Sequence, residues 1–198
     1  MSSYLCFHNS PREAMIWVGK VCYIIPLILS RANANESHFT LQEHLERFTH
    51  ILVDSVLTKH QSSDPIHVLF IGTRSGIIKK LSYNPRSQQA CVVEILHPFA
   101  KGRSVTINTM KLLSYSNAIY MATEENVIRL PVNRCQRFRT QRACLNAMDP
   151  YCGWNQQTNE CTATPNNNPR AGYWQQSLLT CPIMSDPVSN ALKLSNDF

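Results

Sequence analysis

The residues with the clearest chemical potential in this chain of 198 residues are its eight cysteines. Five of them gather near the C-terminal end, and these are Cys135, Cys144, Cys152, Cys161 and Cys181. The other three, Cys6, Cys22 and Cys91, are scattered through the first half. Such a local cluster is typical of a small extracellular module, because a segment of about 50 residues buries too little apolar surface to be stable without disulfides. Spacing alone leaves the pairing open, and an odd number leaves at least one cysteine without a partner inside the module.

The other residue types that serve catalysis or metal binding show no matching spacing. The seven histidines are His8, His38, His44, His50, His60, His67 and His97. The sequence contains no H-E-x-x-H or C-x-x-C pattern for zinc, no G-x-S-x-G elbow and no glycine-rich phosphate loop. We expect His67 and His97, which flank strand ends, to be surface or turn residues. The sequence therefore predicts no enzyme, no catalytic residue, no metal site and no cofactor.

The positive charge of the chain is mild and locally concentrated. Lys and Arg number 19 against 13 Asp and Glu, for a formal net charge of +6. The densest spot consists of Arg134, Arg137, Arg139 and Arg142. A solvated face of a small domain is the favoured interpretation. The alternative is contact with a polyanion such as a proteoglycan glycosaminoglycan. No aromatic stacking platform accompanies these arginines, so we expect no nucleic-acid binding.

An internal repeat indicates which elements precede this module. Val68–Leu81 and Ala118–Pro131 are offset by 50 residues, and each reads as an apolar strand, a polar turn and a second apolar strand. Further strands are expected at Phe48–Leu57 and Val105–Leu113, before the two hairpins, and at Cys91–Leu96 after the first. A four-stranded unit followed by a three-stranded one at this spacing is typical of β-propeller blades. The alternative is a coincidental pair of hairpins in a small sandwich.

Two blades cannot close a propeller, which needs about four to eight. If these are blades, most of the propeller is missing, and open edges and uncovered apolar faces are expected.

The N-terminal segment has the character of a secretory signal. The apolar stretch Met15–Leu29 is interrupted by Lys20 and Pro26, and it is shorter than the roughly 20 residues that a transmembrane helix needs. Ala32-Asn33-Ala34 fits an A-x-A cleavage site, and Asn35 begins the N-E-S glycosylation sequon. The alternative is an irregular, mis-assembled start, because the leader Met1–Asn9 is unusually long and polar. No other long apolar segment is present, so the sequence predicts no membrane anchor within this chain.

The cysteine-rich segment carries a recognisable motif. Cys144–Trp154, with the sequence CLNAMDPYCGW, closely resembles the CxxAxDPYCGW core of the plexin–semaphorin–integrin (PSI) domain of semaphorins. Phe48–Val56 followed by Val68–Thr73 looks like the penultimate blade of a sema propeller, and Val127–Cys135 looks like its last blade. The resemblance covers about residues 38–182 and is most like class 5 semaphorins.

This resemblance implies a mostly β fold in four parts. Residues 1–37 are a signal-like or irregular segment, and residues 38–133 are the last two blades of a seven-bladed sema propeller. Residues 134–182 are the disulfide-rich PSI domain, and residues 183–198 are a tail. Within the PSI domain we expect the aromatic rings of Tyr151, Trp154 and Trp174 to fill the core.

The resemblance also implies a disulfide pattern. Cys135 pairs with Cys152, and Cys144 pairs with Cys161. The second cysteine of the family falls near Gln141, which is not a cysteine, so its usual partner Cys181 is expected to be unpaired or bonded to a segment outside the chain. Plexins and the hepatocyte growth factor receptor also join sema and PSI domains, but they typically carry a further cysteine where Asn155 stands, which argues mildly against a receptor.

The function implied is that of an extracellular or cell-surface guidance ligand. Semaphorins act by binding plexin receptors in axon guidance and cell migration, and they can form homodimers. Their receptor-contacting face lies on earlier blades, while the PSI stalk positions the domains that come after it, and class 5 members continue into a membrane span. We therefore interpret the chain as part of such a ligand. The alternative is a structural remnant, or a receptor-type fragment, that does not bind a receptor independently.

Overall fold

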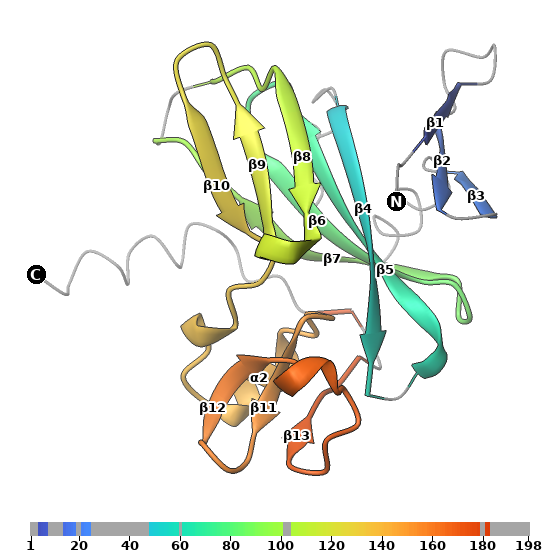
Figure 1. Cartoon of the computed structure of the whole chain (residues 1–198), viewed down its shortest axis with the longest axis vertical. Helices are drawn as coiled ribbons and strands as arrows, with labels where there is room; N and C mark the ends of the chain where they lie inside the picture. The colour runs from blue at the N-terminus through green and yellow to red at the C-terminus, as the bar shows by residue number, and fades with distance from the viewer. Residues whose placement is uncertain are drawn as a thin grey trace, which may run out of the picture.

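The computed structural model describes most of the chain between residues 48 and 182. The described residues are 4–7, 14–18, 21–24, 48–59, 61–100, 104–178, 181 and 182. Four antiparallel sheets account for the strands, and Figure 1 shows two larger sheets above a smaller body. Among the described residues no helix is long and apolar enough to cross a membrane.

The first large sheet is a meander of four strands in the order β4-β5-β6-β7. These strands are β4 (Phe48–Thr58), β5 (Gln61–Thr73), β6 (Ile78–Asn84) and β7 (Gln89–Leu96). The β5–β6 turn depends on Gly76, whose φ of +86° favours glycine and whose added Cβ would lie 2.6 Å from the Val105 carbonyl oxygen. The turn is therefore packed against the segment that leads to the next sheet.

The second large sheet has three strands in the order β10-β9-β8. They are β8 (Thr109–Leu113), β9 (Ala118–Ala122) and β10 (Val127–Pro131), with a short 3-10 helix, Ser114–Ser116, between β8 and β9. The first strand is shorter than expected, because the Val105 amide donates a backbone hydrogen bond to Ser75 in the β5–β6 turn.

The main core lies between these two sheets. Its buried residues are Val68, Phe70, Ile78, Leu96, Ile107, Met110, Ile119, Met121, Leu130 and Val132. The other face of the four-stranded sheet carries a second buried cluster that includes Leu69, Ile71 and Leu81. Strand β5 is thus apolar on both faces, as expected for a sheet stacked between layers. The mostly β fold, with a four-stranded and a three-stranded blade, is confirmed.

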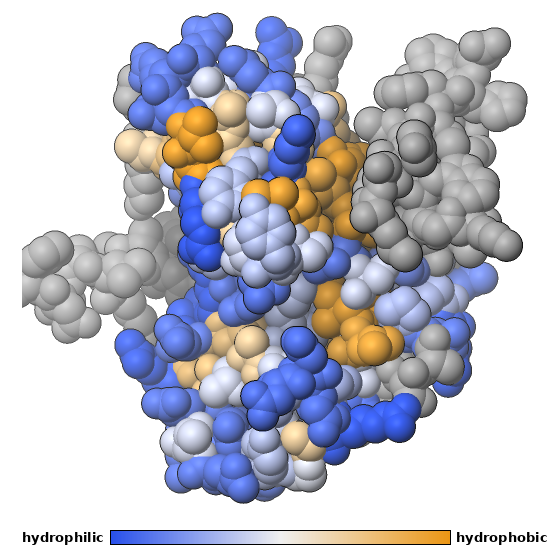
Figure 2. Space-filling model, in the orientation of Figure 1, coloured by the Kyte–Doolittle hydropathy of each residue, from blue (hydrophilic) through white to orange (hydrophobic). Residues whose placement is uncertain are grey.

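Strands β4, β7, β8 and β10 each pair with one other described strand, so each leaves an unpaired edge. Strand β4 pairs only with β5, and the large apolar side chains at its ends, Phe48 and Leu57, are 42% and 52% exposed. Figure 2 shows apolar surface on this side of the blades, whereas the module below is mostly hydrophilic.

The cysteine-rich module forms the smaller body. It contains a 3-10 helix (Cys135–Arg137), helix α2 (Gln141–Asn146), a three-stranded sheet in the order β12-β11-β13 and a second 3-10 helix (Pro165–Asn167). The strands are β11 (Cys152–Asn155), β12 (Glu160–Ala163) and β13 (Trp174–Gln175). Helix α2 begins where the Thr140 hydroxyl accepts a hydrogen bond from the Ala143 amide.

The N-terminal segment contains a three-stranded antiparallel meander. Its strands are β1 (Tyr4–Phe7), β2 (Ala14–Val18) and β3 (Val21–Ile24). The stretch expected to form the apolar core of a signal is thus partly a β-strand, in line with its β-branched and aromatic residues. The expected cleavage site at Ala32–Ala34 and the glycosylation site at Asn35 lie outside the described residues.

Candidate functional site: the junction between blade and module

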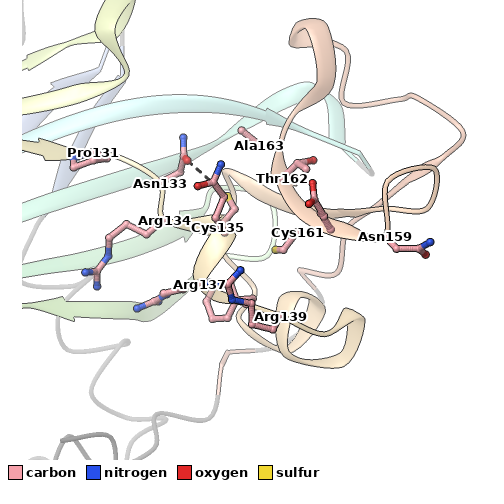
Figure 3. A pocket seen from close by; sticks show the side chains of 13 residues that line it. Pro131, Asn133, Arg134, Cys135, Arg137, Arg139, Asn159, Cys161, Thr162 and Ala163 are labelled. Atoms are coloured by element: carbon pink, nitrogen blue, oxygen red, sulfur yellow. Dashed lines mark hydrogen bonds between the residues drawn. The ribbon is translucent and has the colours of Figure 1, made fainter. Parts of the chain in front are cut away.

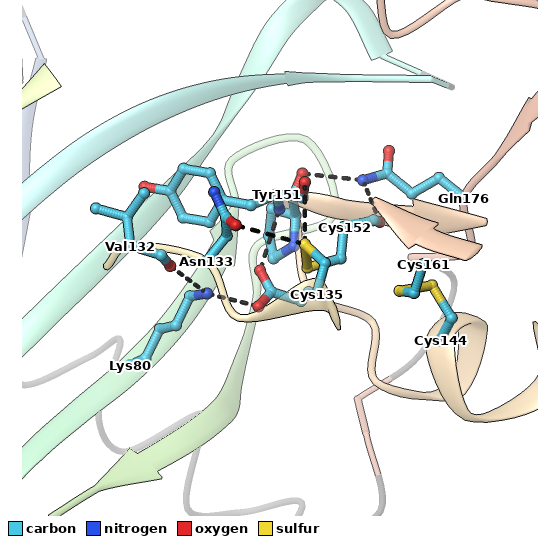
Figure 4. Close-up of a disulfide and its surroundings, with 11 residues drawn as sticks. Lys80, Val132, Asn133, Cys135, Cys144, Tyr151, Cys152, Cys161 and Gln176 are labelled. Carbon is cyan, nitrogen blue, oxygen red and sulfur yellow. Dashed lines mark hydrogen bonds and ion pairs between the residues drawn. A yellow bond between two sulfur atoms is a disulfide. The ribbon is translucent and has the colours of Figure 1, made fainter. Parts of the chain in front are cut away.

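A buried lysine lies where the four-stranded sheet meets the module. The strand register places Phe70, Lys80 and Glu94 side by side on neighbouring strands β5, β6 and β7. Lys80 is fully buried, and its ammonium lies 2.6 Å from Oδ2 of Asp149. It also donates a 2.9 Å hydrogen bond to the carbonyl of Val132. Figure 4 shows this lysine reaching from the sheet toward the module.

Aromatic rings complete the environment of the ammonium group. The Lys80 nitrogen lies 4.7 Å from the centroid of the Tyr151 ring and 5.9 Å from that of Phe70. A cation near the face of an aromatic ring is attracted by its quadrupole, and the attraction is larger when water is excluded. The positive charge is therefore held by one carboxylate, one carbonyl and two rings.

Asp149 shapes the module's side of the junction. Its Oδ1 accepts a hydrogen bond of 3.1 Å from the Tyr151 amide, and its carbonyl accepts one of 2.9 Å from the Cys152 amide. The carboxylate therefore both forms the turn at Pro150 and pairs with Lys80. Because Asp149 is only 2% exposed, removal of the lysine would leave a buried and unpaired charge.

Tyr151 joins the same motif to the first strand of the blade. Its hydroxyl donates a 2.7 Å hydrogen bond to Oδ2 of Asp54 on β4. Burial, followed by the nearby charge of Asp54, raises the pKa of the Tyr151 phenol far above its ordinary value. The phenol thus stays protonated and acts as a donor. The ring does more than fill the module's core as expected, since it packs against both the module and the core between the two sheets.

The turn between β4 and β5 forms hydrogen bonds with the C-terminal part of the module. The Lys59 ammonium donates to the carbonyls of Ala171 and Trp174, and the Lys59 amide donates to Oε1 of Gln176 over 3.1 Å. The Gln176 amide group in turn donates to the carbonyl of Pro150 over 2.9 Å. These contacts connect the turn, the last strand and the central motif of the module.

The glycine of the CLNAMDPYCGW motif, Gly153, is required by the packing around it. A Cβ added to Gly153 would lie 2.4 Å from the ring of Trp174, which is fully buried. Trp154, which is 8% exposed, packs with the four cysteines of the module's own core. Trp154 and Trp174 are therefore packing residues, as expected.

Glu94 forms a second ionic contact across the junction. This carboxylate on β7 is nearly buried and pairs with both Arg134 and Arg137. Desolvation lowers the pKa of Arg137, whose guanidinium also lies 4.6 Å over the ring of Phe138. Two of the four clustered arginines are thus engaged in joining blade to module.

Three of the four clustered arginines line one groove. Arg134, Arg137 and Arg139 line a groove of about 960 Å³ between the first 3-10 helix of the module and β12 (Figure 3). Arg142 is not among the residues that line this groove. Glu160 also lines this groove, and Glu94 pairs with Arg137. The two carboxylates offset part of the positive charge of the arginines. Arg139 and Arg142 are exposed while Arg134 and Arg137 pair with Glu94, so the solvated face and the polyanion contact both stay predictions.

Two disulfides lie inside the module. Cys135 bonds to Cys152 with an S–S distance of 2.00 Å, and Cys144 bonds to Cys161 with one of 1.97 Å. This is the pairing that the resemblance implied.

The expectation for Cys181 was wrong. Cys181 is bonded to Cys91 on β7, with a Cα–Cα distance of 5.2 Å. The two residues are separated by 90 positions in the sequence and meet only because the end of the module lies against the blade. At the position of the absent cysteine, the side-chain amide of Gln141 donates a 2.7 Å hydrogen bond to Oε1 of Gln175.

Sequence reasoning missed four polar residues of this site: Lys59, Lys80, Asp54 and Glu94. One signal was present, because the adjacent pair Lys79-Lys80 interrupts an apolar strand, and alternation must point one of the two toward the core. His67 also departs from expectation, since it is buried and its ring Nδ1 lies 3.1 Å from the Ser55 hydroxyl. Among the described residues no cluster of His, Cys, Asp and Glu could hold a metal ion.

The geometry defines a class of protein: propeller-type blades with a disulfide-rich module docked on them. Comparison with family models agrees, because a Sema domain matches residues 23–114 and a Plexin repeat, of the PSI type, matches residues 134–182. The chain belongs to the semaphorin family, and its similarity is to class 5 members.

Two relatives illustrate the similarity. Semaphorin-5B of Homo sapiens is 38% identical over 139 residues, which cover 69% of this chain and 12% of that protein. Semaphorin 5c of Drosophila melanogaster is 35% identical over 147 residues, which cover 73% of this chain and 13% of that protein. The chain thus spans a small part of the length of these relatives.

Solved structures share the fold. The extracellular domains 1-2 of Drosophila Semaphorin 1b match with a TM-score of 0.57 and 20% identity, covering 78% of this chain and 30% of that one. A chain in the structure of Drosophila Plexin A in complex with Semaphorin 1b matches with a TM-score of 0.57 and 19% identity, covering 70% of this chain and 28% of that one.

Proposed function

We propose that this chain is the rear part of an extracellular, semaphorin-type guidance ligand that acts by binding plexin-type receptors. Its own role is mechanical: it holds the PSI module in a fixed orientation against the last blades, so that the propeller is presented correctly. Family membership supports the ligand class. One solved relative is in a complex of plexin and semaphorin, which supports the class of receptor. Binding, not catalysis, is the proposed activity.

The observation that carries this proposal is the polar network of the junction. A fully buried lysine on β6 is neutralised by Asp149 of the module, and Tyr151 of the module is bonded to Asp54 of β4. Polar groups buried in this way require their partners, because an unpaired buried charge is strongly destabilising. The network therefore favours a single docked arrangement over a flexible linkage.

Receptor binding can be tested with and without the preceding blades. A plexin ectodomain is immobilised, and binding is measured for the 198-residue chain and for a protein in which earlier sema blades precede it. We expect saturable binding only for the longer protein, because the resemblance places the receptor face on earlier blades. Absence of binding by the longer protein would contradict a ligand role.

The positioning role requires a junction variant in the longer protein. Lys80→Met removes the buried charge, and Lys111→Met, at an exposed position on β8, is the matched control. We expect the first variant alone to change the orientation of the module, as measured by small-angle scattering. An unchanged scattering profile for a folded Lys80→Met protein would argue against positioning by this network.

The alternative of a structural remnant rests on the open edge of β4. A strand that is paired on one side only and exposes Phe48 and Leu57 is prone to pair with another chain. If the 198-residue chain is isolated only as aggregates or oligomers, whereas the longer protein is monomeric, the remnant interpretation is favoured for the chain alone.

Two partner classes remain further proposals. A glycosaminoglycan contact would rely on Arg139 and Arg142, which are exposed, more than on Arg134 and Arg137, which pair with Glu94. Heparin-affinity chromatography of Arg139→Ala/Arg142→Ala against the unaltered chain tests this contact. Homodimerisation is tested by analytical ultracentrifugation of the longer protein.

A further inference from the structure

The disulfide between Cys91 and Cys181 differs in position from the other two in the described part of the chain. The module's own disulfides each join residues 17 positions apart, whereas this one joins residues 90 apart and connects β7 to the end of the module. It is thus the covalent link between the blade and the point at which the chain leaves the module.

The disulfides also differ in accessibility. Cys135, Cys144, Cys152 and Cys161 are each 2% exposed and form the core of the module. Cys181 is only partly buried, while its partner Cys91 is 6% exposed. An external thiolate must reach a sulfur atom along the S–S axis, so access favours attack at Cys181.

Several contacts that dock the module are made by residues outside this bond. Lys80 and Asp149 hold the motif, Lys59 holds the carbonyl of Trp174, and Gln176 is bonded to the carbonyl of Pro150. All of these contacts precede residue 178 in the chain. We therefore expect cleavage of the bond to release the end of the module and to leave its body in place.

We propose that Cys91–Cys181 is a site of reductive modification, a latch that a dithiol reductant opens while the module stays docked. A thiolate of the dithiol attacks Sγ of Cys181, forms a mixed disulfide and releases Cys91 as a thiolate, which takes up a proton. The second thiol of the reductant then attacks its own mixed disulfide and frees Cys181 as a thiol. The protein disulfide gains two electrons and two protons, and the reductant leaves as a disulfide.

A side-chain amide stands beside the proposed point of attack. Nε2 of Gln89 lies 3.7 Å from Sγ of Cys181. In the second step Cys181 is the leaving group, and an amide N–H at this position can stabilise the negative charge that develops on its sulfur, since hydrogen bonds to charged groups are stronger than neutral ones. Gln89 is therefore a candidate positioning residue for the exchange. The proposal concerns the redox state of the chain and stands apart from receptor binding.

Graded reduction of the native chain tests the latch. The protein is incubated with increasing dithiothreitol, quenched with iodoacetamide and mapped by mass spectrometry. We expect Cys91 and Cys181 to be alkylated at dithiothreitol concentrations about tenfold lower than the four module cysteines, because thiol access governs the rate. Alkylation of the module cysteines at equal or lower concentrations would overturn the proposal.

A second measurement, hydrogen exchange, tests whether the module stays docked after the bond is reduced. Hydrogen exchange of the partially reduced protein should remain slow on β6 and β11 and become faster at the amide of Cys181. The variant Cys91→Ser/Cys181→Ser should give the same pattern without reductant, and Cys144→Ser/Cys161→Ser, which removes a buried bond, is the matched comparison. Faster exchange of β11 on opening of Cys91–Cys181 would show that the bond supports docking, and would overturn the latch. Gln89→Leu should slow the opening severalfold, and an unchanged rate would remove Gln89 from the proposal.

Discussion

Replacement of Lys80 by methionine tests the buried ion pair of the junction. Methionine keeps most of the length and volume of the lysine stem but removes the ammonium group. The variant loses the 2.6 Å ion pair to Asp149 and the 2.9 Å hydrogen bond to Val132. It leaves the Asp149 carboxylate, 2% exposed, without its cationic partner.

The expected loss results from that unpaired charge. Removing one partner of a buried ion pair typically costs about 3 to 5 kcal/mol, because the remaining charge is neither solvated nor neutralised. With a denaturant slope of about 2 kcal/mol per molar urea, the midpoint of unfolding should fall by roughly 2 M. Such a loss is a large fraction of the roughly 5 to 15 kcal/mol that stabilises an ordinary domain.

Tryptophan fluorescence during urea unfolding measures this loss of stability in the module. Two of the three tryptophans, Trp154 and Trp174, lie in the module, and Trp17→Phe removes the third. A double-mutant cycle with Asp149→Asn isolates the pair, since asparagine can keep the acceptor for the Tyr151 amide. We expect a coupling free energy above about 1 kcal/mol. A Lys80→Met protein within about 1 kcal/mol of the parent, or a coupling near zero, would refute the reasoning.

Three further predictions concern single residues of the blade and module. Because the folded-state pKa of Tyr151 is raised, the unfolded chain loses a proton above about pH 10 that the folded chain keeps, so stability should fall as the pH rises beyond 10. Tyr151→Phe should remove that part of the slope and cost about 1.5 to 3 kcal/mol at neutral pH, measured by urea unfolding. Burial lowers the pKa of His67 from 6.5, so the unfolded chain takes up a proton that the folded chain does not, and stability should fall as the pH drops below 6.5. His67→Asn should flatten this slope, and a slope that is unchanged would contradict burial of the ring in its neutral form. Gly153→Ala should cost at least about 1 to 3 kcal/mol through overlap with a buried ring, whereas Gly172→Ala, with nothing within 4 Å of its added Cβ, should be nearly neutral. Equal stabilities of these two alanine variants would contradict the packing described for the motif.

The blades could be predicted because their signal is local. Each hairpin shows apolar strands around a short polar turn, and the repeat at 50 residues relates β5 and β6 to β9 and β10. Sheet order then results from short antiparallel connections. The ends were less well defined, since β5 extends back to Gln61 and β8 begins only at Thr109.

The junction could not be predicted because its contacts are between distant residues. The motif around Asp149 and Tyr151 was visible, but nothing in its spacing shows that Lys80 and Asp54 on two separate strands are its partners. Cys91 gives no signal for the same reason, as it lies 90 residues from Cys181 and outside the cysteine-rich segment. Residues that join the blade to the module show no periodic sequence pattern in either the blade or the module.

Disulfide mapping under non-reducing conditions tests the docking of the module most directly. Trypsin should yield a peptide beginning at Ser87 bonded to one beginning at Ala171, and further cleavage at Asp149 and after Glu160 separates the remaining cysteines. The structure predicts the pairs Cys91–Cys181, Cys135–Cys152 and Cys144–Cys161. Cys91 and Cys181 can bond only if the end of the module lies against β7, because disulfides require Cα atoms within about 7 Å. Recovery of Cys91 and Cys181 as separate thiols from protein kept oxidised, or of either bonded to another cysteine, would contradict the docked arrangement.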